Sequence, residues 1–187
     1  MSTSTQTAGT TTWNLDPTHS LVEFSAKHMM ITMVKGRFTD VKGTIHVDEN
    51  NPDRSVVEVE IAAASLDTGT EQRDAHLRSG DFLGVDSFPA VTFRSKRVEG
   101  AYAQPGDSFR VVGDLTIRGT TREVVLDATF EGTGADPWGG ERASFSAETK
   151  IDRRDFGLTW NVALEAGGIL VSNQIKLSLQ VQAVKVQ

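Results

Sequence analysis

Apolar and polar residues alternate with a period of two over most of the chain. In Val56–Ile61, three apolar side chains point to one face and two glutamates point to the other. The run Ile175–Ala183 repeats this pattern, with a polar residue at every second position from Lys176 onward. Because alternate side chains of a strand lie on opposite faces, both runs predict strands with one wet face and one buried face.

Runs of this kind recur along the chain, and residues that favour turns separate them. Only Thr70–Arg78 has the features of a helix, with Thr70 as its N-cap and Gly80 just beyond its end. About eight or nine antiparallel strands predict an all-β, eight-stranded barrel, and a two-sheet sandwich is the alternative because alternation cannot show whether the first and last strands pair. The predicted strands are Leu21–Lys27, Lys35–Phe38, Val41–Val47, Val56–Ile61, Ala90–Arg97, Phe109–Arg118, Val124–Phe130, Arg142–Ile151 and Ile175–Ala183.

The composition excludes several classes of function. The 187 residues include 25 acidic and 19 basic side chains, for a formal net charge of −6, and no cysteine. The length predicts one domain, which we expect over residues 13–187, with the Ser- and Thr-rich residues 1–12 as a disordered tail. The lack of cysteine excludes disulfides, thiolate metal sites and a cysteine nucleophile. Because no basic run is present, nucleic acid is not expected as a partner.

The apolar stretches and the start of the chain bear on its location. No apolar stretch approaches the ~20 residues that a helix needs to cross a bilayer. Residues 1–12 contain neither the basic region nor the apolar region of a secretory signal peptide. The sequence as given therefore predicts a cytoplasmic protein.

The inward positions of the predicted strands form a wall of Val, Leu, Ile, Phe and Ala. An eight-stranded barrel is either filled by these side chains or leaves room for one small ligand, and periodicity leaves both alternatives open. Small inward residues such as Gly113 and Ala128 favour a lumen. The apolar segment Val162–Val171 is a candidate loop over the mouth, and Met29–Met33 offers adaptable side chains for irregular contacts. The candidate lumen residues are Phe24, Met30, Val57, Val59, Ile61, Phe93, Val111, Leu115, Ile117, Leu126, Phe130, Phe145, Ile175, Leu177 and Leu179.

Several short motifs follow one another in a recognisable order. They include Trp13–Ser20, Val22–His28, Arg73–Ser79, Gly113–Gly119 and Ile151–Leu158. In order and spacing they resemble the YceI-like family of small bacterial proteins, over essentially residues 13–184. The resemblance implies a lipocalin-like antiparallel barrel whose apolar tunnel holds a polyisoprenoid or similar amphiphile, such as an isoprenoid quinone or its precursor. Many members of that family are exported to the periplasm, and this sequence departs from them in lacking a signal peptide.

Histidine side chains can bind a metal or the head group of a ligand, and the chain contains four of them. No two of them have the spacing of a metal-binding pair on a helix or strand, so we expect neither a metal nor another cofactor. His28, Arg73 and His76 are the candidate contacts to the ligand's head group at the tunnel mouth. The alternative for each is a structural hydrogen bond that ties a loop to the barrel.

A binding protein is predicted rather than an enzyme. The chain has no Gly-x-Ser-x-Gly motif, and no catalytic residue is assigned. The alternative is an enzyme acting on an isoprenoid lipid, in which His28 or His76 would be the general base beside Asp74 or Asp155.

Neighbouring charges predict two structural ion pairs. Arg73–Asp74 would hold the helix across the barrel end, and Arg153–Asp155 is interpreted in the same way. These arginines are also the first donors to consider for a phosphate or carboxylate head group.

The expected partners follow from the apolar lumen. They are an isoprenoid or other long-chain lipid, a membrane in transient contact, and a second copy of the chain paired through a strand edge or an apolar mouth.

Overall fold

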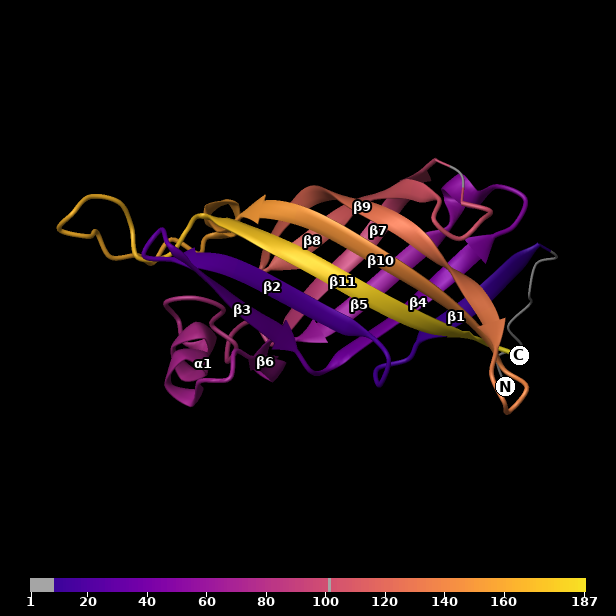
Figure 1. The fold of residues 1–187 in the computed structure, drawn as a ribbon, viewed down its shortest axis with the longest axis horizontal. Helices are drawn as coiled ribbons and strands as arrows, with labels where there is room; N and C mark the ends of the chain where they lie inside the picture. Colours follow the sequence, from indigo (N-terminus) through magenta and orange to yellow (C-terminus); the bar gives the residue numbers. More distant parts are fainter. Residues whose placement is uncertain (1–8, 101) are drawn as a thin grey trace.

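Eight strands form a closed antiparallel ring (Figure 1). The computed structural model describes residues 9–100 and 102–187, so the first eight residues of the predicted tail lie outside it. The helices of these ranges are α1 (Glu71–Arg78) and three short 3-10 turns, η1 (Pro52–Arg54), η2 (Ala63–Ser65) and η3 (Arg153–Phe156). The strands are β1 (Thr10–Leu15), β2 (Leu21–His28), β3 (Thr32–Phe38), β4 (Val41–Asp48), β5 (Val56–Ala62), β6 (Leu66–Asp67), β7 (Ala90–Glu99), β8 (Ser108–Ile117), β9 (Thr120–Ala135), β10 (Glu141–Asp152) and β11 (Gln174–Lys185).

The ring runs in the order β1-β4-β5-β7-β8-β9-β10-β11 and closes where β11 pairs with β1. The closing register places Trp13 opposite Lys185 and Leu15 opposite Ala183. The predicted eight-stranded barrel is therefore confirmed, and the sandwich alternative is wrong.

The edge of β11 that pairs with β1 also pairs with β2. The first half of β11 pairs with β2, from Lys176 opposite Ser25 to Gln180 opposite Leu21, and the last residues of β11 pair with β1. Strands β3 and β6 continue from β2, and α1 lies next to β6 at that end of the barrel (Figure 1). None of the helices in the described ranges combines the length and the apolar character that crossing a membrane requires.

Two features at the boundaries differ from the predictions. Strand β1 begins at Thr10, so residues 10–12 belong to the barrel and not to the tail. Threonine favours strands, and these residues pair with β4, where Thr12 lies opposite His46. Strand β6 has only two residues, which is too short for a visible alternation. The helix lies where it was predicted, although the Thr70 side chain forms no capping hydrogen bond.

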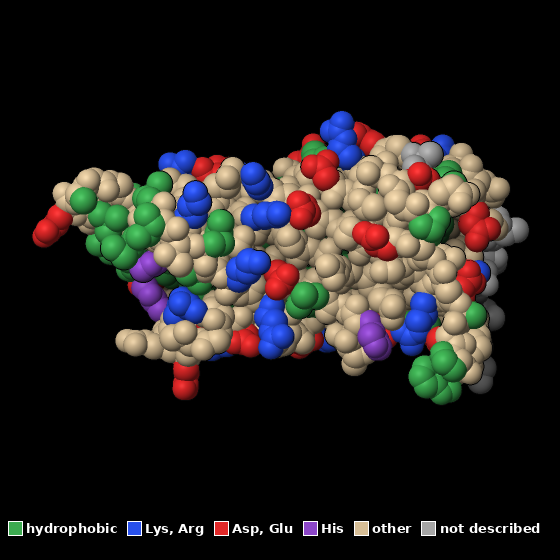
Figure 2. Space-filling view, in the orientation of Figure 1, with side chains coloured by type: hydrophobic (Ala, Val, Ile, Leu, Met, Phe, Trp, Pro, Cys, Tyr) green, Lys and Arg blue, Asp and Glu red, His purple; other side chains and the backbone are tan. Residues whose placement is uncertain are grey.

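The two faces of the wall follow the predicted alternation. Leu177 and Leu179 of β11 face the interior, whereas the intervening strand positions face out. Lys176, for example, forms an ion pair with Glu148 of β10 on the outer surface at 3.0 Å. Figure 2 shows basic and acidic side chains distributed over this outer surface.

A polar cluster holds the end of the barrel where the β9–β10 hairpin lies. Arg142 donates to Asp16 at 2.6 Å, to Gln182 at 2.9 Å and to Asp136 at 3.1 Å. It thereby joins the segment after β1, strand β11 and the β9–β10 hairpin. Hydrogen bonds from Thr18 and Arg142 hold the pKa of Asp16 well below its usual range.

We expect Asp16→Asn to destabilise the protein in a pH-dependent way. Removing a partly buried carboxylate that accepts charged hydrogen bonds should cost roughly 1–3 kcal/mol at pH 7. Because the pKa of Asp16 is lower in the folded protein than the unfolded value of about 3.9, its contribution is present above that value and is lost as the pH falls further. Urea unfolding at pH 7, 4 and 2.5 should therefore show the difference from wild type shrinking below about pH 4.

The matched control is Glu148→Gln, which breaks an exposed ion pair on the outer wall. Its urea midpoint should stay close to that of the wild type, because surface pairs contribute little. An Asp16→Asn protein as stable as the control at pH 7 would refute the structural role of the cluster.

Candidate binding cavity

A narrow cavity of about 280 Å³ lies inside the barrel. On β11 it extends from Ile175 to Val181, a span of roughly 20 Å along the strand. Its volume is near the lower end of the range of about 300–1,000 Å³ found for small-molecule sites. The predicted lumen residues that line it are Phe24, Val57, Val59, Ile61, Phe93, Val111, Leu115, Ile117, Leu126, Phe145, Ile175, Leu177 and Leu179.

Two predicted lumen residues lie elsewhere. Met30 is 50% exposed and belongs to the turn between β2 and β3, where Met29 and Met30 both have positive φ. This turn extends beyond the wall, so Met30 does not line the cavity. Phe130 is buried, but it packs behind the lining against Phe145 and Tyr102, with ring centroids 5.4 and 6.1 Å away.

Aromatic rings cover glycines on neighbouring strands and so set the width of the lumen. A Cβ at Gly36 would lie 2.3 Å from the ring of Phe24, and one at Gly113 would lie 2.6 Å from the ring of Phe93. Gly113 therefore does not add empty space, as its small size suggested, because Phe93 occupies the space above it. These rings therefore occupy the space that the two glycines would otherwise leave inside the wall.

The lining offers little polarity to a ligand. Among the described lining residues, only Ser55, Tyr102, Ser146 and Arg153 are polar. The Ser146 hydroxyl donates to Glu131 at 2.6 Å, and the Ser55 hydroxyl accepts from the Asp48 amide at 3.2 Å. An occupant must therefore be apolar over most of its length, because an unpaired polar group would lose its hydrogen bonds to water.

Arg153 is the charged residue of the lining, and only 3% of the residue is exposed. Its guanidinium donates to four backbone carbonyls, those of Leu158 (2.7 Å), Trp160 (2.9 Å), Ser172 (3.0 Å) and Val171 (3.4 Å). These bonds tie both ends of the segment between η3 and β11 to one point. Burial lowers the pKa of Arg153, but arginine stays protonated in proteins.

The predicted ion pairs of the arginines are wrong. Arg73 donates to the hydroxyl and the carbonyl of Thr68 at 2.7 and 2.8 Å, while Asp74 accepts from the amide and hydroxyl of the same threonine. Arg154 pairs with Asp152 rather than with Asp155, and this hydrogen bond lowers the pKa of Asp152 to about 2. Charges adjacent in sequence point in different directions at these turns, which explains the error.

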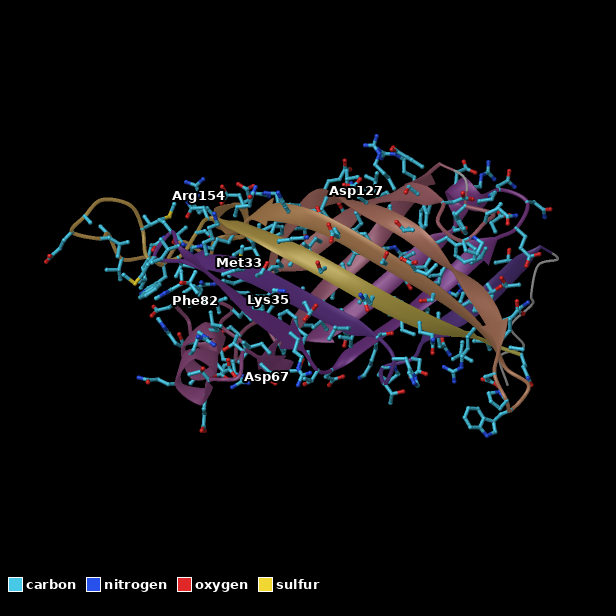
Figure 3. The ribbon with its side chains drawn as sticks, in the orientation of Figure 1. Met33, Lys35, Asp67, Phe82, Asp127 and Arg154 are labelled. Carbon is cyan, nitrogen blue, oxygen red and sulfur yellow. The ribbon has the colours of Figure 1, made fainter. Side chains whose placement is uncertain are left out.

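The three candidate head-group residues lie outside the cavity lining. His28 is exposed at the end of β2, next to Val171. On α1, Arg73 binds Thr68, and His76 contacts Asp81 at 2.9 Å. The His76 ring also packs edge-on against Phe82 and Trp160, at the barrel end where Figure 3 labels Phe82. Their head-group role stays a prediction.

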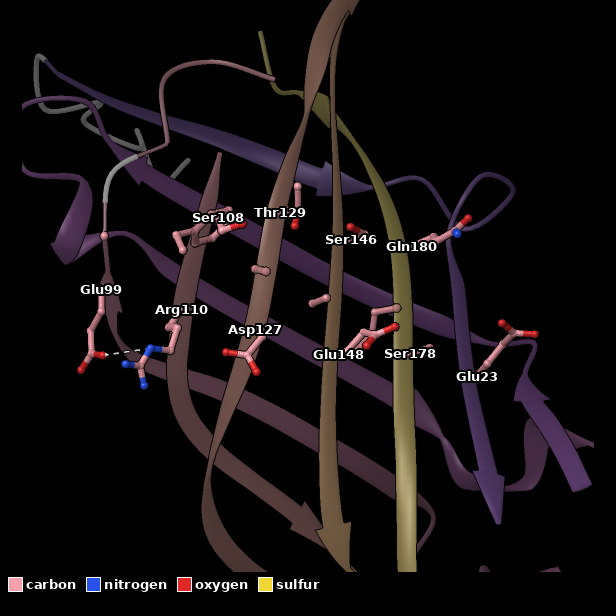
Figure 4. A pocket seen from close by; sticks show the side chains of 15 residues that line it. Glu23, Glu99, Ser108, Arg110, Asp127, Thr129, Ser146, Glu148, Ser178 and Gln180 are labelled. Atoms are coloured by element: carbon pink, nitrogen blue, oxygen red, sulfur yellow. Dashed lines mark ion pairs between the residues drawn. The ribbon is translucent and has the colours of Figure 1, made fainter. Parts of the chain in front are cut away.

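The described residues contain one further place that could hold a ligand. No group of three or more His, Asp or Glu in these ranges is placed to hold a metal ion. A groove of about 890 Å³ crosses the outer wall over β8 to β11 and β2. Short serine side chains and the carboxylates of Glu23, Asp127 and Glu148 line it (Figure 4). It is open and polar, in contrast to the lumen.

We expect Arg153→Met to loosen the segment between η3 and β11. Methionine has a similar length but leaves four carbonyls without their donor, which should cost about 2–4 kcal/mol. Hydrogen exchange should accelerate over residues 158–173 more than over the ring strands.

Arg154→Met is the control, since it removes the neighbouring arginine, whose side chain is 56% exposed. Its exchange pattern should resemble that of the wild type. Equal protection of residues 158–173 in both variants would contradict the role given to Arg153.

Comparison with known proteins identifies relatives over most of the chain. Residues 13–183 match the YceI-like domain. The chain is 39% identical to Protein YceI of Salmonella newport (strain SL254) over 167 residues, which is 89% of this chain and 82% of that protein. It is similar to the Campylobacter jejuni YCEI protein structure, with 31% identity and a TM-score of 0.73 over 86% of this chain and 90% of that one.

A more distant structure shares the fold. It is a polyisoprenoid binding domain from Saccharophagus degradans implicated in plant cell wall breakdown. Its identity to this chain is 14%, with a TM-score of 0.67 over 91% of this chain and 97% of that one. The match of the family over nearly the whole barrel agrees with the ring order and the apolar lumen, and the chain belongs to the YceI-like domain family.

Proposed function

We propose that the protein binds a long-chain apolar or amphiphilic lipid in its lumen, most simply a polyisoprenoid such as an isoprenoid quinone or its precursor. The observation that carries this proposal is the apolar cavity that follows the barrel axis for most of β11. Holding such a chain away from water would serve sequestration, storage or transport.

The dimensions of the cavity favour a slender chain. A volume of about 280 Å³ spread over roughly 20 Å fits a slender isoprenoid chain better than a fused ring system. A drug-sized ligand gains about 0.3 kcal/mol per heavy atom, so a chain of roughly 30 to 40 carbons would have enough contacts for tight binding. Because such a chain exceeds the volume present, its binding would require lining side chains to move or part of the chain to lie outside.

The relatives support the same class of ligand. The structure from Saccharophagus degradans is a polyisoprenoid binding domain with the same fold, and the family match supports a shared type of site. The polar residues support binding over catalysis: His28 and His76 lie outside the lining, so neither is placed to act on a chain in the lumen. The cytoplasmic location stays a prediction from the sequence.

The proposal predicts that a tryptophan inside the lumen blocks lipid binding. Val59→Trp would place an indole in the cavity, whereas Glu60→Trp makes the same addition at the next residue on the outer face. With geranylgeraniol as the probe, the wild type and Glu60→Trp should melt at higher temperature when lipid is added, because a ligand that binds only the folded state stabilises it. Val59→Trp should show little shift.

Overpacking the lumen costs about 1–3 kcal/mol, so each variant is first checked for a cooperative melt without lipid. Native mass spectrometry then measures the bound lipid directly. Equal lipid binding by both tryptophan variants, or no binding by the wild type, would disprove a site in the lumen.

A further inference from the structure

Large apolar side chains are exposed at one end of the barrel. In the turn between β2 and β3, Met29 is 45% exposed, Met30 is 50% exposed and Ile31 is 80% exposed. Met33 and Val162 are also about half exposed, at 51% and 46%. We call these five residues the apolar tip. Figure 2 shows the corresponding hydrophobic patch at the left end of the molecule.

The apolar tip is held in place by the segment that precedes β11. The Met29 amide donates to the Leu170 carbonyl at 2.7 Å, and the Leu170 amide donates to the Val162 carbonyl at 2.9 Å. The Lys27 amide donates to the Ser172 hydroxyl at 2.9 Å. Residues 161–172, which we call the mouth loop, project with the turn beyond the barrel (Figure 1). The exposed side chains therefore sit on a built surface formed by two segments.

Basic residues lie in register just behind the apolar tip. On the outer face, Lys150 lies opposite Lys176, Lys176 opposite Ser25, and Ser25 opposite Lys35. Lys27 lies opposite Met33, one cross-strand pair from the end of the hairpin. We call Lys27, Lys35, Lys150 and Lys176 the basic band. Figure 3 labels Met33 and Lys35 close together at this end.

The basic band contrasts with the acidic chain as a whole, whose formal net charge is −6. Lys176 is paired with Glu148 at 3.0 Å, but among the described residues Lys27, Lys35 and Lys150 form no ion pair. Glu165 of the mouth loop, Asp155 and Asp81 are acidic residues at this end, and Asp81 contacts His76. Lys27 and Lys35 lie on the same face of the β2–β3 hairpin as Met33, so the positive charge is concentrated beside the apolar tip on this face.

The spacing of the two features matches the surface of a bilayer. Lys27 lies two residues before Met29 of the turn, so at most about 7 Å of chain separates their Cα atoms. The headgroup region of one leaflet is about 5–7 Å thick. An apolar group at the boundary of the acyl chains would therefore place Lys27 at the level of the lipid phosphates, with the other lysines of the basic band farther along the strands.

We propose that this end of the barrel docks on an anionic phospholipid bilayer. The apolar tip enters the boundary between headgroups and acyl chains, and the basic band contacts the phosphates, as in other interfacial proteins. The docked end is also an end of the lumen: Val171 of the mouth loop and Ala26 of β2 line the cavity beside it. The role of docking in loading a lipid into the lumen rests on the proposed function, whereas docking itself is measured without a ligand in the lumen.

The test is co-sedimentation with sucrose-loaded vesicles of phosphatidylcholine alone or with phosphatidylglycerol. The wild type should bind the anionic vesicles and lose binding in high salt. The double variant Met30→Asn with Ile31→Ser should bind at least tenfold more weakly. Asparagine tolerates the positive φ of Met30, so the turn is preserved. Trp138→Ser is the matched control, because it removes an 86% exposed side chain from the β9–β10 hairpin.

Charge reversal tests the basic band separately. Lys27→Glu with Lys35→Glu should weaken binding to anionic vesicles by roughly tenfold or more. Lys42→Glu combined with Arg110→Glu, on β4 and β8, reverses the same amount of charge outside the band and should have a smaller effect.

The outcomes separate docking from lumen binding. Val59→Trp should still bind vesicles after losing geranylgeraniol, so a failure of the proposed function leaves the docking result readable. Docking is overturned if the wild type does not bind anionic vesicles, or if the apolar-tip variant binds as well as Trp138→Ser. It is also overturned if vesicle binding is absent and sedimentation velocity shows a dimer that Met30→Asn with Ile31→Ser abolishes. In that case a second copy of the chain would cover the apolar tip.

Discussion

The architecture depends on one edge of strand β11, with which two other strands pair. Strand β11 pairs with β10 along one side, and on the other side it pairs first with β2 and then with β1. The pairing with β1 closes the ring, so the backbone groups of the wall bond to neighbouring strands rather than to the interior. The pairing with β2 builds the end that carries α1 and the apolar tip. A single twelve-residue strand thus determines both the lumen and its mouth.

Closure of the backbone ladder allows the inner wall to be apolar. Because the peptide groups find partners within the wall, lumen side chains need no polar function, and the fold tolerates a cavity where a filled core would gain more contacts. Phe24 over Gly36 and Phe93 over Gly113 keep this space narrow. Such a lumen selects by shape and apolarity, which agrees with a slender lipid and gives little basis for recognising a particular head group.

The inner wall could be predicted from the sequence because its cause is local. A period of two assigns each residue of β5 or β11 to a face, whichever strand lies beside it. Ring closure depends on pairing between residues far apart in the chain, which periodicity does not encode. Met30 was misplaced because the three-residue turn between β2 and β3 ends the alternation and carries its side chain beyond the wall. In the sequence, Arg153 lies between the charged residues Asp152 and Arg154 and therefore resembles an exposed side chain. Its burial is evident only in the structure, where its guanidinium donates to four backbone carbonyls.

The two ends of the lumen are closed by different interactions, and this difference decides which end can open. At the β9–β10 hairpin, Arg142 joins segments that also pair within the ring, so parting them would break strand pairing. At the other end, α1 follows the two-residue strand β6, and the mouth loop is tied by Arg153 and a few backbone bonds. Opening there leaves all eight ring pairings intact. The end that can open at least cost is therefore the end that carries exposed methionines and unpaired lysines.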